Sequence, residues 1–363
     1  MLSSKKTIKT VLPKIDLRKG IKGSLVHDFY KKHPKTFPYK KSLRSLLKAL
    51  EWPKAENYDA IHEYPKGVTF DWGNVGQGVA NDGKNWFFSC EDALWKIPAH
   101  FDLGIEIDED TPSVIKKGLD EDDMPYLVSK GVEHLGDLDY FKSKGQSKGQ
   151  LYVPAEGGKG VIALFDAETL NYIVSSDPLT SQEGSVPWCA INPLNGLLYS
   201  SKFKDSYLSL CVYDRAVLST TSPDKGIFRL ELTFLGNFDL YDEDGNRIVI
   251  NAIQGGVFSK NGHFYLVCDT AHDKRDKGEV RNSGIYGFDM LTGRRVFHKV
   301  VPYNPSFHID EELEGIDIWD LDSGGAPNIG GQIHLLMTNY NWYENDNIYL
   351  KHFRIEDAVK DKI

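Results

Sequence analysis

The chain has 363 residues, of which 40% are hydrophobic, and this suits one large or two ordinary soluble globular domains. No apolar run approaches the roughly 20 residues that span a bilayer, and the N-terminus lacks the apolar segment of a secretory signal. Residues 1–50 carry a net charge of +12 and the whole chain −9, so residues 51–363 carry −21. This acidic body argues against nucleic acid as the partner of the main domain.

The basic N-terminal arm, residues 1–57, lacks the strand pattern of the rest of the chain. Within it, Leu43, Leu46, Leu47 and Leu50 follow the i, i+3, i+4, i+7 spacing of a short helix with one apolar face. We expect this helix to dock on the side of the main domain rather than on a membrane. Three interpretations of the arm stay open: it lies back on its own domain, binds a polyanion, or is a targeting presequence.

Residues 58–363 contain five repeats of one strand pattern. Each repeat opens with a short strand near a glycine or an acid, turns into a second strand, and ends with a third. The openings are residues 76–80, 135–139, 186–190, 254–258 and 313–317. The second strands are 86–88, 151–153, 197–199, 264–266 and 333–335, and the third strands are 93–97, 162–166, 210–214, 285–289 and 348–352. The openings are 59, 51, 68 and 59 residues apart, measured at Val79, Leu138, Cys189, Val257 and Ile316.

These repeats predict an all-β fold, a five-bladed β-propeller with an N-terminal basic, partly helical arm. One four-stranded blade with its loops fits the spacing, and each blade buries its apolar face only by stacking on its neighbours around an axis. The fifth repeat ends at its third strand, near Ile355. We therefore expect residues 58–70 to supply its outer strand and to close the ring, which removes the open sheet edges.

The four cysteines, Cys90, Cys189, Cys211 and Cys268, have neither the spacing of a zinc site nor the density of a disulfide framework. They fall within predicted strands, where a free cysteine behaves as a small buried hydrophobe. Free thiols favour a reducing, cytoplasmic compartment, with secretion left open.

A candidate axial site follows from the architecture, because the first strand of each blade lines the central channel. The polar and aromatic side chains expected at the channel mouth are Gln77, His134, Asp137, Trp188, Gln254 and Glu314, with Asp139, Asp317 and Trp342 nearby. Acids and amides there can exchange hydrogen bonds with sugar hydroxyls, while tryptophans offer a flat face to the sugar ring. The alternative is that the polar residues only hydrogen-bond to neighbouring blades.

Asp137 and Glu314 are the best pair of carboxylates, because both occupy blade openings. They are candidate ligands of Ca²⁺, which prefers oxygen donors. They are equally candidates for the acid and base of a hydrolase or cyclase, if their environments separate their pKa values. The stretch 156–160, Glu-Gly-Gly-Lys-Gly, lacks the Walker spacing and is interpreted as a hairpin turn.

The openings at residues 76–83 and 136–140 resemble the blade starts of plant-type glutaminyl cyclases. Similar layouts occur in calcium-activated nucleotidases and olfactomedin domains, where a central cation is common. The resemblance covers residues 70–355 as architecture and implies the five-bladed propeller. It extends to no catalytic set, and a fold does not fix a function.

Three hypotheses of function follow. The first is a ligand-binding propeller whose axial site takes a small polar molecule or glycan, a carbohydrate above all, with or without Ca²⁺. The second is a hydrolase or cyclase that uses the paired carboxylates at the mouth. The third is a protein-interaction scaffold whose partner is held by the basic arm.

Overall fold

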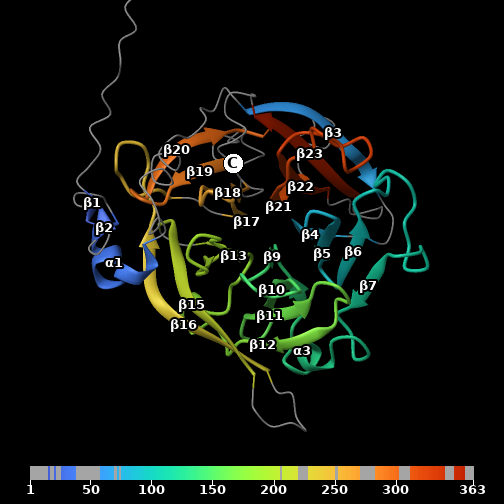
Figure 1. The fold of residues 1–363 in the computed structure, drawn as a ribbon, viewed down its shortest axis with the longest axis horizontal. Helices are drawn as coiled ribbons and strands as arrows, with labels where there is room; N and C mark the ends of the chain where they lie inside the picture. Colours follow the sequence, from blue (N-terminus) through green and yellow to red (C-terminus); the bar gives the residue numbers. More distant parts are fainter. Residues whose placement is uncertain are drawn as a thin grey trace, which may run out of the picture.

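The computed structural model describes residues 15–16, 20–21, 26–37, 58–68, 72, 75–204, 207–219, 228–249, 252–269, 283–301, 311–339 and 347–355. Within these residues, four four-stranded sheets and one five-stranded sheet form a ring around a central axis (Figure 1). The predicted five-bladed β-propeller is confirmed.

Each blade runs from an inner strand beside the axis to an outer strand at the rim. Blade 1 consists of β4 (Gly76–Asn81), β5 (Asn85–Cys90), β6 (Ala93–Pro98) and β7 (Ile115–Gly118). Blade 2 consists of β8 (His134–Leu135), β9 (Asp139–Phe141), β10 (Gln150–Glu156), β11 (Val161–Asp166) and β12 (Tyr172–Ser175). Blade 3 consists of β13 (Ala190–Ile191), β14 (Leu198–Ser200), β15 (Ser209–Ser219) and β16 (Phe228–Asp239). Blade 4 consists of β17 (Ile253–Phe258), β18 (Phe264–Cys268), β19 (Gly284–Asp289) and β20 (Arg294–Lys299). Blade 5 consists of β21 (Glu311–Ile318), β22 (Ile333–Asn339), β23 (Asn347–Ile355) and β3 (Tyr58–Val68).

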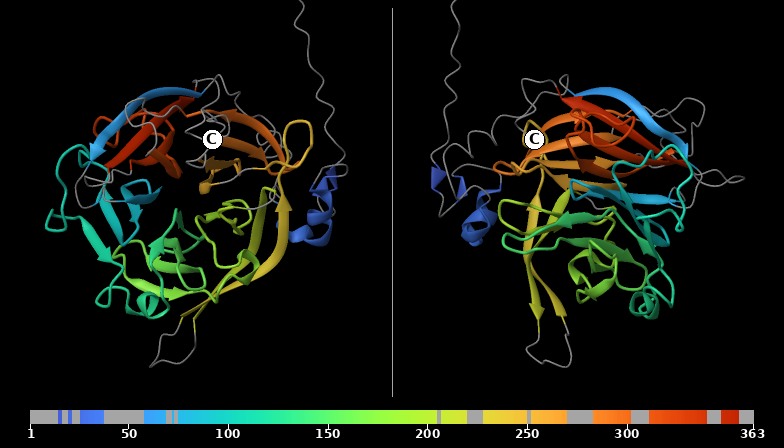
Figure 2. Two further views of the ribbon diagram at one scale, coloured as in Figure 1. Left: turned by 180° about the vertical axis from the view of Figure 1, so that it is seen from behind. Right: turned by 45° about the vertical axis from the view of Figure 1, so that its right-hand side comes forward.

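Strand β3 occupies the outer position expected for a segment that precedes the first blade. It pairs antiparallel with β23, from Val68 opposite Ile348 to Tyr58 opposite Ile355. The first strand of the domain and the last therefore lie side by side, which joins the two ends of the propeller (Figure 1). In the views of Figure 2, the long hairpin of β15 and β16 reaches beyond the neighbouring blades.

The hydrophobic core is divided among the blade interfaces. Five clusters of buried side chains occur in the described residues, and each joins two neighbouring blades. The four cysteines are free and buried, as predicted. Every interface around the ring therefore contributes apolar burial, which is the physical reason that the repeats require one another.

The described part of the arm packs on its own domain. Helix α1 (His27–Lys32) and the 3-10 helix η1 (Pro34–Thr36) lie against the rim where blades 3 and 4 meet (Figure 1). The ring centroids of Phe29 and Phe238 are 5.4 Å apart, and the Tyr30 hydroxyl donates to the Met290 carbonyl. The helix predicted from Leu43 to Leu50 lies outside the described residues.

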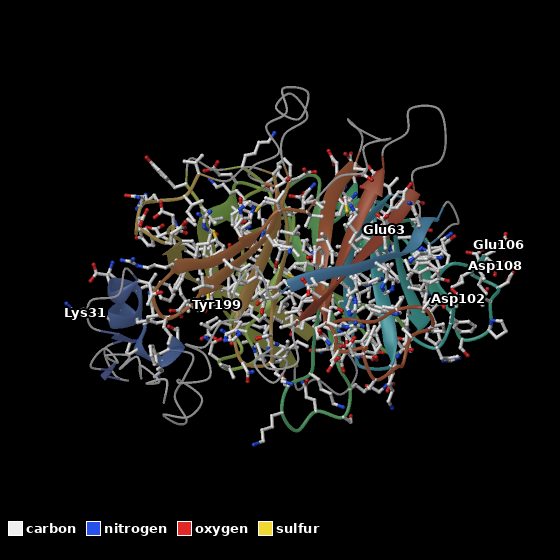
Figure 3. The ribbon with its side chains drawn as sticks, turned by 90° about the horizontal axis from the view of Figure 1, so that it is seen from above. Lys31, Glu63, Asp102, Glu106, Asp108 and Tyr199 are labelled. Carbon is white, nitrogen blue, oxygen red and sulfur yellow. The ribbon has the colours of Figure 1, made fainter. Side chains whose placement is uncertain are left out.

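Basic and acidic surfaces occupy opposite edges of the ring. Figure 3 shows Lys31 of α1 at one edge and the acidic loop with Asp102, Glu106 and Asp108 at the other. Of the helices in the described residues, including the short α3 (Pro125–Ser129), none has the length and apolarity needed to cross a membrane.

Candidate axial site

Asp137 connects all five blades at the axis. Its side-chain oxygens accept hydrogen bonds from the backbone N–H groups of Val79 in blade 1 and Gly256 in blade 4, each at 3.1 Å, and Ile316 in blade 5 supplies a third. Its own backbone bonds to blade 3, through the Pro187 carbonyl at 2.8 Å and the Cys189 N–H at 3.1 Å. Burial raises the pKa of Asp137 well above its usual range, and the three N–H donors act against that rise.

Glycines let three inner strands close around this carboxylate. A Cβ on Gly78 would lie 2.5 Å from the Asp137 Cα, and one on Gly255 would lie 2.6 Å from its Oδ2. A Cβ on Gly315 would lie 2.7 Å from the Gly78 Cα. The repeat alignment predicts Asp137 at an open mouth, whereas the structure places it fully buried in the interior, with the backbones of blades 1, 4 and 5 packed around it.

Three equivalent residues lie one position before these glycines, toward the start of each inner strand. Gln77, Gln254 and Glu314, here called the mouth residues, each occupy a β-bulge where the inner strand has an extra residue. The equivalence corrects the repeat alignment, which is wrong by one residue in blade 4. Gly256, not Val257, corresponds to Val79, because both donate to Asp137.

Two of the three mouth residues carry amide side chains. Gln77 is largely buried, with 6% of its surface exposed, and Gln254 is half-buried. Neither side chain has a hydrogen-bond partner in the part of the chain that the structure describes. Each amide has both donor and acceptor groups.

Glu314, the third mouth residue, carries a carboxyl group that favours its protonated form. Burial raises its pKa well above the usual range, and the nearby carboxylates of Glu312 and Asp269 add to this. The Glu314 side chain also hydrogen-bonds to Glu312, and Thr338 lies 3.4 Å from its Oε1. The protonated form that burial favours carries both a donor and an acceptor, as the two amides do.

The acids at the ends of second strands connect successive blades. Glu156 accepts the N–H of Val186 at the start of blade 3, and Asp269 accepts the N–H of Leu313 at the start of blade 5, at 3.1 Å. His134 lies opposite Glu156 across β8 and β10, and burial lowers its pKa while Glu156 opposes that shift. The Glu156 and Asp269 carboxylates therefore each hydrogen-bond to the backbone of the next blade.

The two tryptophans proposed as stacking platforms have different positions. Trp188 is fully buried between blades 3 and 4, where its indole N–H donates to Ser201 Oγ at 2.9 Å and its ring covers Gly256. Its faces are occupied by core contacts, including Phe264 with ring centroids 5.6 Å apart, so it offers no open face to a sugar. Trp342 lies outside the described residues.

A calcium site has no complete ligand set in the described residues. No group of three or more His, Cys, Asp and Glu side chains there has an arrangement that could hold a metal ion. The two carboxylates predicted as ligands are also unsuited, because Asp137 is engaged by backbone N–H groups and Glu314 favours its protonated form.

Two residues next to the mouth residue Glu314, namely Glu312 and Thr338, were not among the predicted site residues. They face each other across β21 and β22, beside Glu314. The sequence contains one signal that could have identified Glu312. It lies two residues before Glu314, and residues two apart on a strand share a face.

Comparisons with known proteins find only distant matches. No protein-family model matches the chain, and no curated protein matches its sequence. Among solved structures, glutaminyl cyclase from Myxococcus xanthus matches with 14% identity over 83% of this chain and 97% of that chain, with a TM-score of 0.44. A GH43_1 enzyme from Xanthomonas citri in complex with xylose matches with 13% identity over 85% and 92%, with a TM-score of 0.44. A gluconolactonase from Xanthomonas campestris matches with 9% identity over 83% and 96%, with a TM-score of 0.37.

Proposed function

We propose that the axial mouth binds a neutral polyhydroxylated ligand, a carbohydrate above all. The observation that carries this proposal is the chemistry of the mouth residues. Gln77 and Gln254 have amides that hydrogen-bond to no group in the described parts of the chain, and Glu314 favours an uncharged carboxyl group. Three blades thus present, at one level, three uncharged groups that both donate and accept hydrogen bonds.

Sugar hydroxyls need partners of this kind, because each hydroxyl donates one hydrogen bond and accepts others. Uncharged donors and acceptors cost less to desolvate than a full charge when the ligand excludes water. The mouth residues are less suitable ligands for Ca²⁺, because Ca²⁺ prefers ionised carboxylates and its binding would require Glu314 to release a proton. If Ca²⁺ does bind here, its affinity will rise with pH, which distinguishes it from a neutral sugar.

Direct binding measurements test the proposal. A panel of glycans identifies a ligand, and calorimetry then compares the wild type with Gln77→Ala and Gln254→Ala. Loss of one or two hydrogen bonds, each worth about 1 kcal/mol, should weaken binding by about 5- to 30-fold. Gln146→Ala, in an exposed loop, is the matched control. Unchanged affinity in both mouth variants would contradict the proposal.

A second candidate function is acid–base catalysis at the same mouth. The raised pKa of Glu314 favours it, since a general acid must hold its proton near neutral pH. Asp137 is a poor partner because both of its oxygens already accept backbone N–H groups. Glu314→Gln separates the two functions, because glutamine keeps a donor and an acceptor but cannot transfer a proton. Ligand binding without turnover in that variant, against turnover in the wild type, would identify an enzyme.

A further inference from the structure

A second pocket, separate from the mouth residues, lies at blade 2. Its volume is about 560 Å³, within the range of small-molecule sites. It is lined by the end of α3, the loop that joins β10 to β11, and the residues that follow β12. No mouth residue is among its lining residues.

The pocket is basic on an otherwise acidic domain. Lys130 and Lys159 line it, and neither forms an ion pair within the described residues. The carboxylate in the lining, Asp177, lies 3.4 Å from Arg229 and is thereby partly neutralised. The Lys130 Nζ lies 5.3 Å from the centroid of the Tyr126 ring. Two ammonium groups without a carboxylate partner in the described residues, in one hollow, favour an anionic ligand.

The glycine-rich turn adds backbone donors to these charges. The N–H groups of residues 157–159 donate to no protein group in the described structure. Gly157 and Gly158 have φ angles of 98° and 58°, and a Cβ on Gly157 would lie 2.4 Å from the Gly131 carbonyl oxygen. A Cβ on Gly158 would lie 2.6 Å from the Lys130 carbonyl oxygen. Glycine is therefore what brings this turn against the segment that carries Lys130, and successive free N–H groups in such turns are anion donors.

One wall of the pocket is apolar. Val132, Val161 and Pro178 contribute to it, and Tyr126 is 47% exposed at its edge. The Tyr126 ring stacks on Tyr172 with centroids 5.8 Å apart, which fixes its position. The pocket is also far larger than one tetrahedral anion, so its shape suits an anion joined to an organic group.

We propose that this pocket binds the phosphate monoester of a small organic molecule. A phosphate monoester carries up to two negative charges and three acceptor oxygens, which match two ammonium groups and several N–H donors. A carboxylate would bring one charge and two oxygens, and would leave part of this donor set without a partner. The site stands apart from the proposed axial function, because it shares no residue with the mouth.

Calorimetry with phenyl phosphate, inorganic phosphate and phenol tests the proposal. We expect phenyl phosphate to bind the wild type with a Kd of about 1 mM or tighter, inorganic phosphate to bind more weakly, and phenol not to bind. Lys130→Ala and Lys159→Ala should each weaken phenyl phosphate binding by about fivefold, through loss of a charge-assisted contact. Both lysines are exposed, so these variants should fold. Lys144→Ala, an exposed lysine in the 142–149 loop, is the matched control.

Three results would overturn the proposal. The first is wild-type protein that binds neither phosphate compound. The second is a double variant, Lys130→Ala with Lys159→Ala, that binds phenyl phosphate as tightly as the wild type. The third is an equal loss in the Lys144→Ala control, which would show a general charge effect and no defined site.

Discussion

Replacing Asp137 tests whether one buried carboxylate joins the blades. In Asp137→Asn one oxygen is kept, while the new NH₂ group faces a backbone N–H that had an acceptor. Of the three donors, from Val79, Gly256 and Ile316, at least one then loses its partner in the interior. An unsatisfied buried donor costs about 1–3 kcal/mol, and removal of the buried charge offsets part of this. We expect a net loss of about 1–2 kcal/mol in the free energy of unfolding, and a larger loss in Asp137→Ala, where no acceptor remains.

Urea unfolding is the assay, with the midpoint and slope both fitted, because an unchanged slope attributes the shift to stability alone. Asp122→Asn is the control, since it makes the same change of charge at an exposed position. If Asp137→Asn lies within about 0.5 kcal/mol of that control, which is the size of an ordinary surface effect, the reasoning is refuted. In that case the three N–H groups would have other acceptors, and the stability of the blade packing at the axis would not depend on the Asp137 carboxylate.

Further predictions concern the axis, the blade 5 interior and the arm. Gly255→Ala should destabilise the fold by about 1–3 kcal/mol in urea unfolding, since its Cβ would lie 2.6 Å from Asp137 Oδ2; an unchanged midpoint would contradict this. Burial lowers the pKa of His334 to about 4, below its unfolded value of about 6.5. Its contribution to stability is therefore fully present above about pH 6.5 and is lost as the pH falls to 4, by up to about 3 kcal/mol. His334→Gln should flatten this part of the pH profile, and an unaltered slope would count against the assignment. Tyr30→Ala should cost about 3–5 kcal/mol through lost packing against blades 3 and 4, and a thermal midpoint equal to wild type would show that the arm is not docked.

The repeated strand pattern could be predicted from the sequence because the features that define it are local in the chain. Turn residues such as Asn195-Gly196 and Asn261-Gly262 separate short apolar strands at regular intervals, and both glycines have the positive φ angles that such turns need. The missing outer strand of the last repeat likewise pointed to residues 58–70, and β3 lies there. Local pattern was thus sufficient for the number of blades and the order of their strands.

The depth of each residue along the axis could not be predicted from the sequence. It depends on β-bulges, which shift the pairing by one residue, as between Ile253 and Gly255. The position of Asp137 is set by N–H groups 58 and 119 residues away in the sequence, and no neighbouring residue signals them. Gln77 and Gln254 were predicted at the mouth, and the structure adds that they occupy equivalent bulges.

The role of Trp188 also depends on distant residues. An aromatic residue at a blade opening suits either a ligand platform or the core, and its own strand does not decide between them. Gly256, in the next blade, leaves the space that the indole fills, with the ring 2.7 Å from where a Cβ would be. A larger residue there would exclude the ring from this interface.

Thermal unfolding with a panel of neutral sugars, with Ca²⁺ and with EDTA tests the central claim most directly. The proteins are the wild type and the double variant Gln77→Ala with Gln254→Ala. A ligand at 100 times its Kd stabilises by about 2.7 kcal/mol, which is a rise in Tm of roughly 5 °C for a domain of this size. We predict such a rise with at least one neutral sugar in the wild type and its loss in the double variant. No rise with any sugar, or an equal rise in both proteins, would contradict a carbohydrate site at the axial mouth.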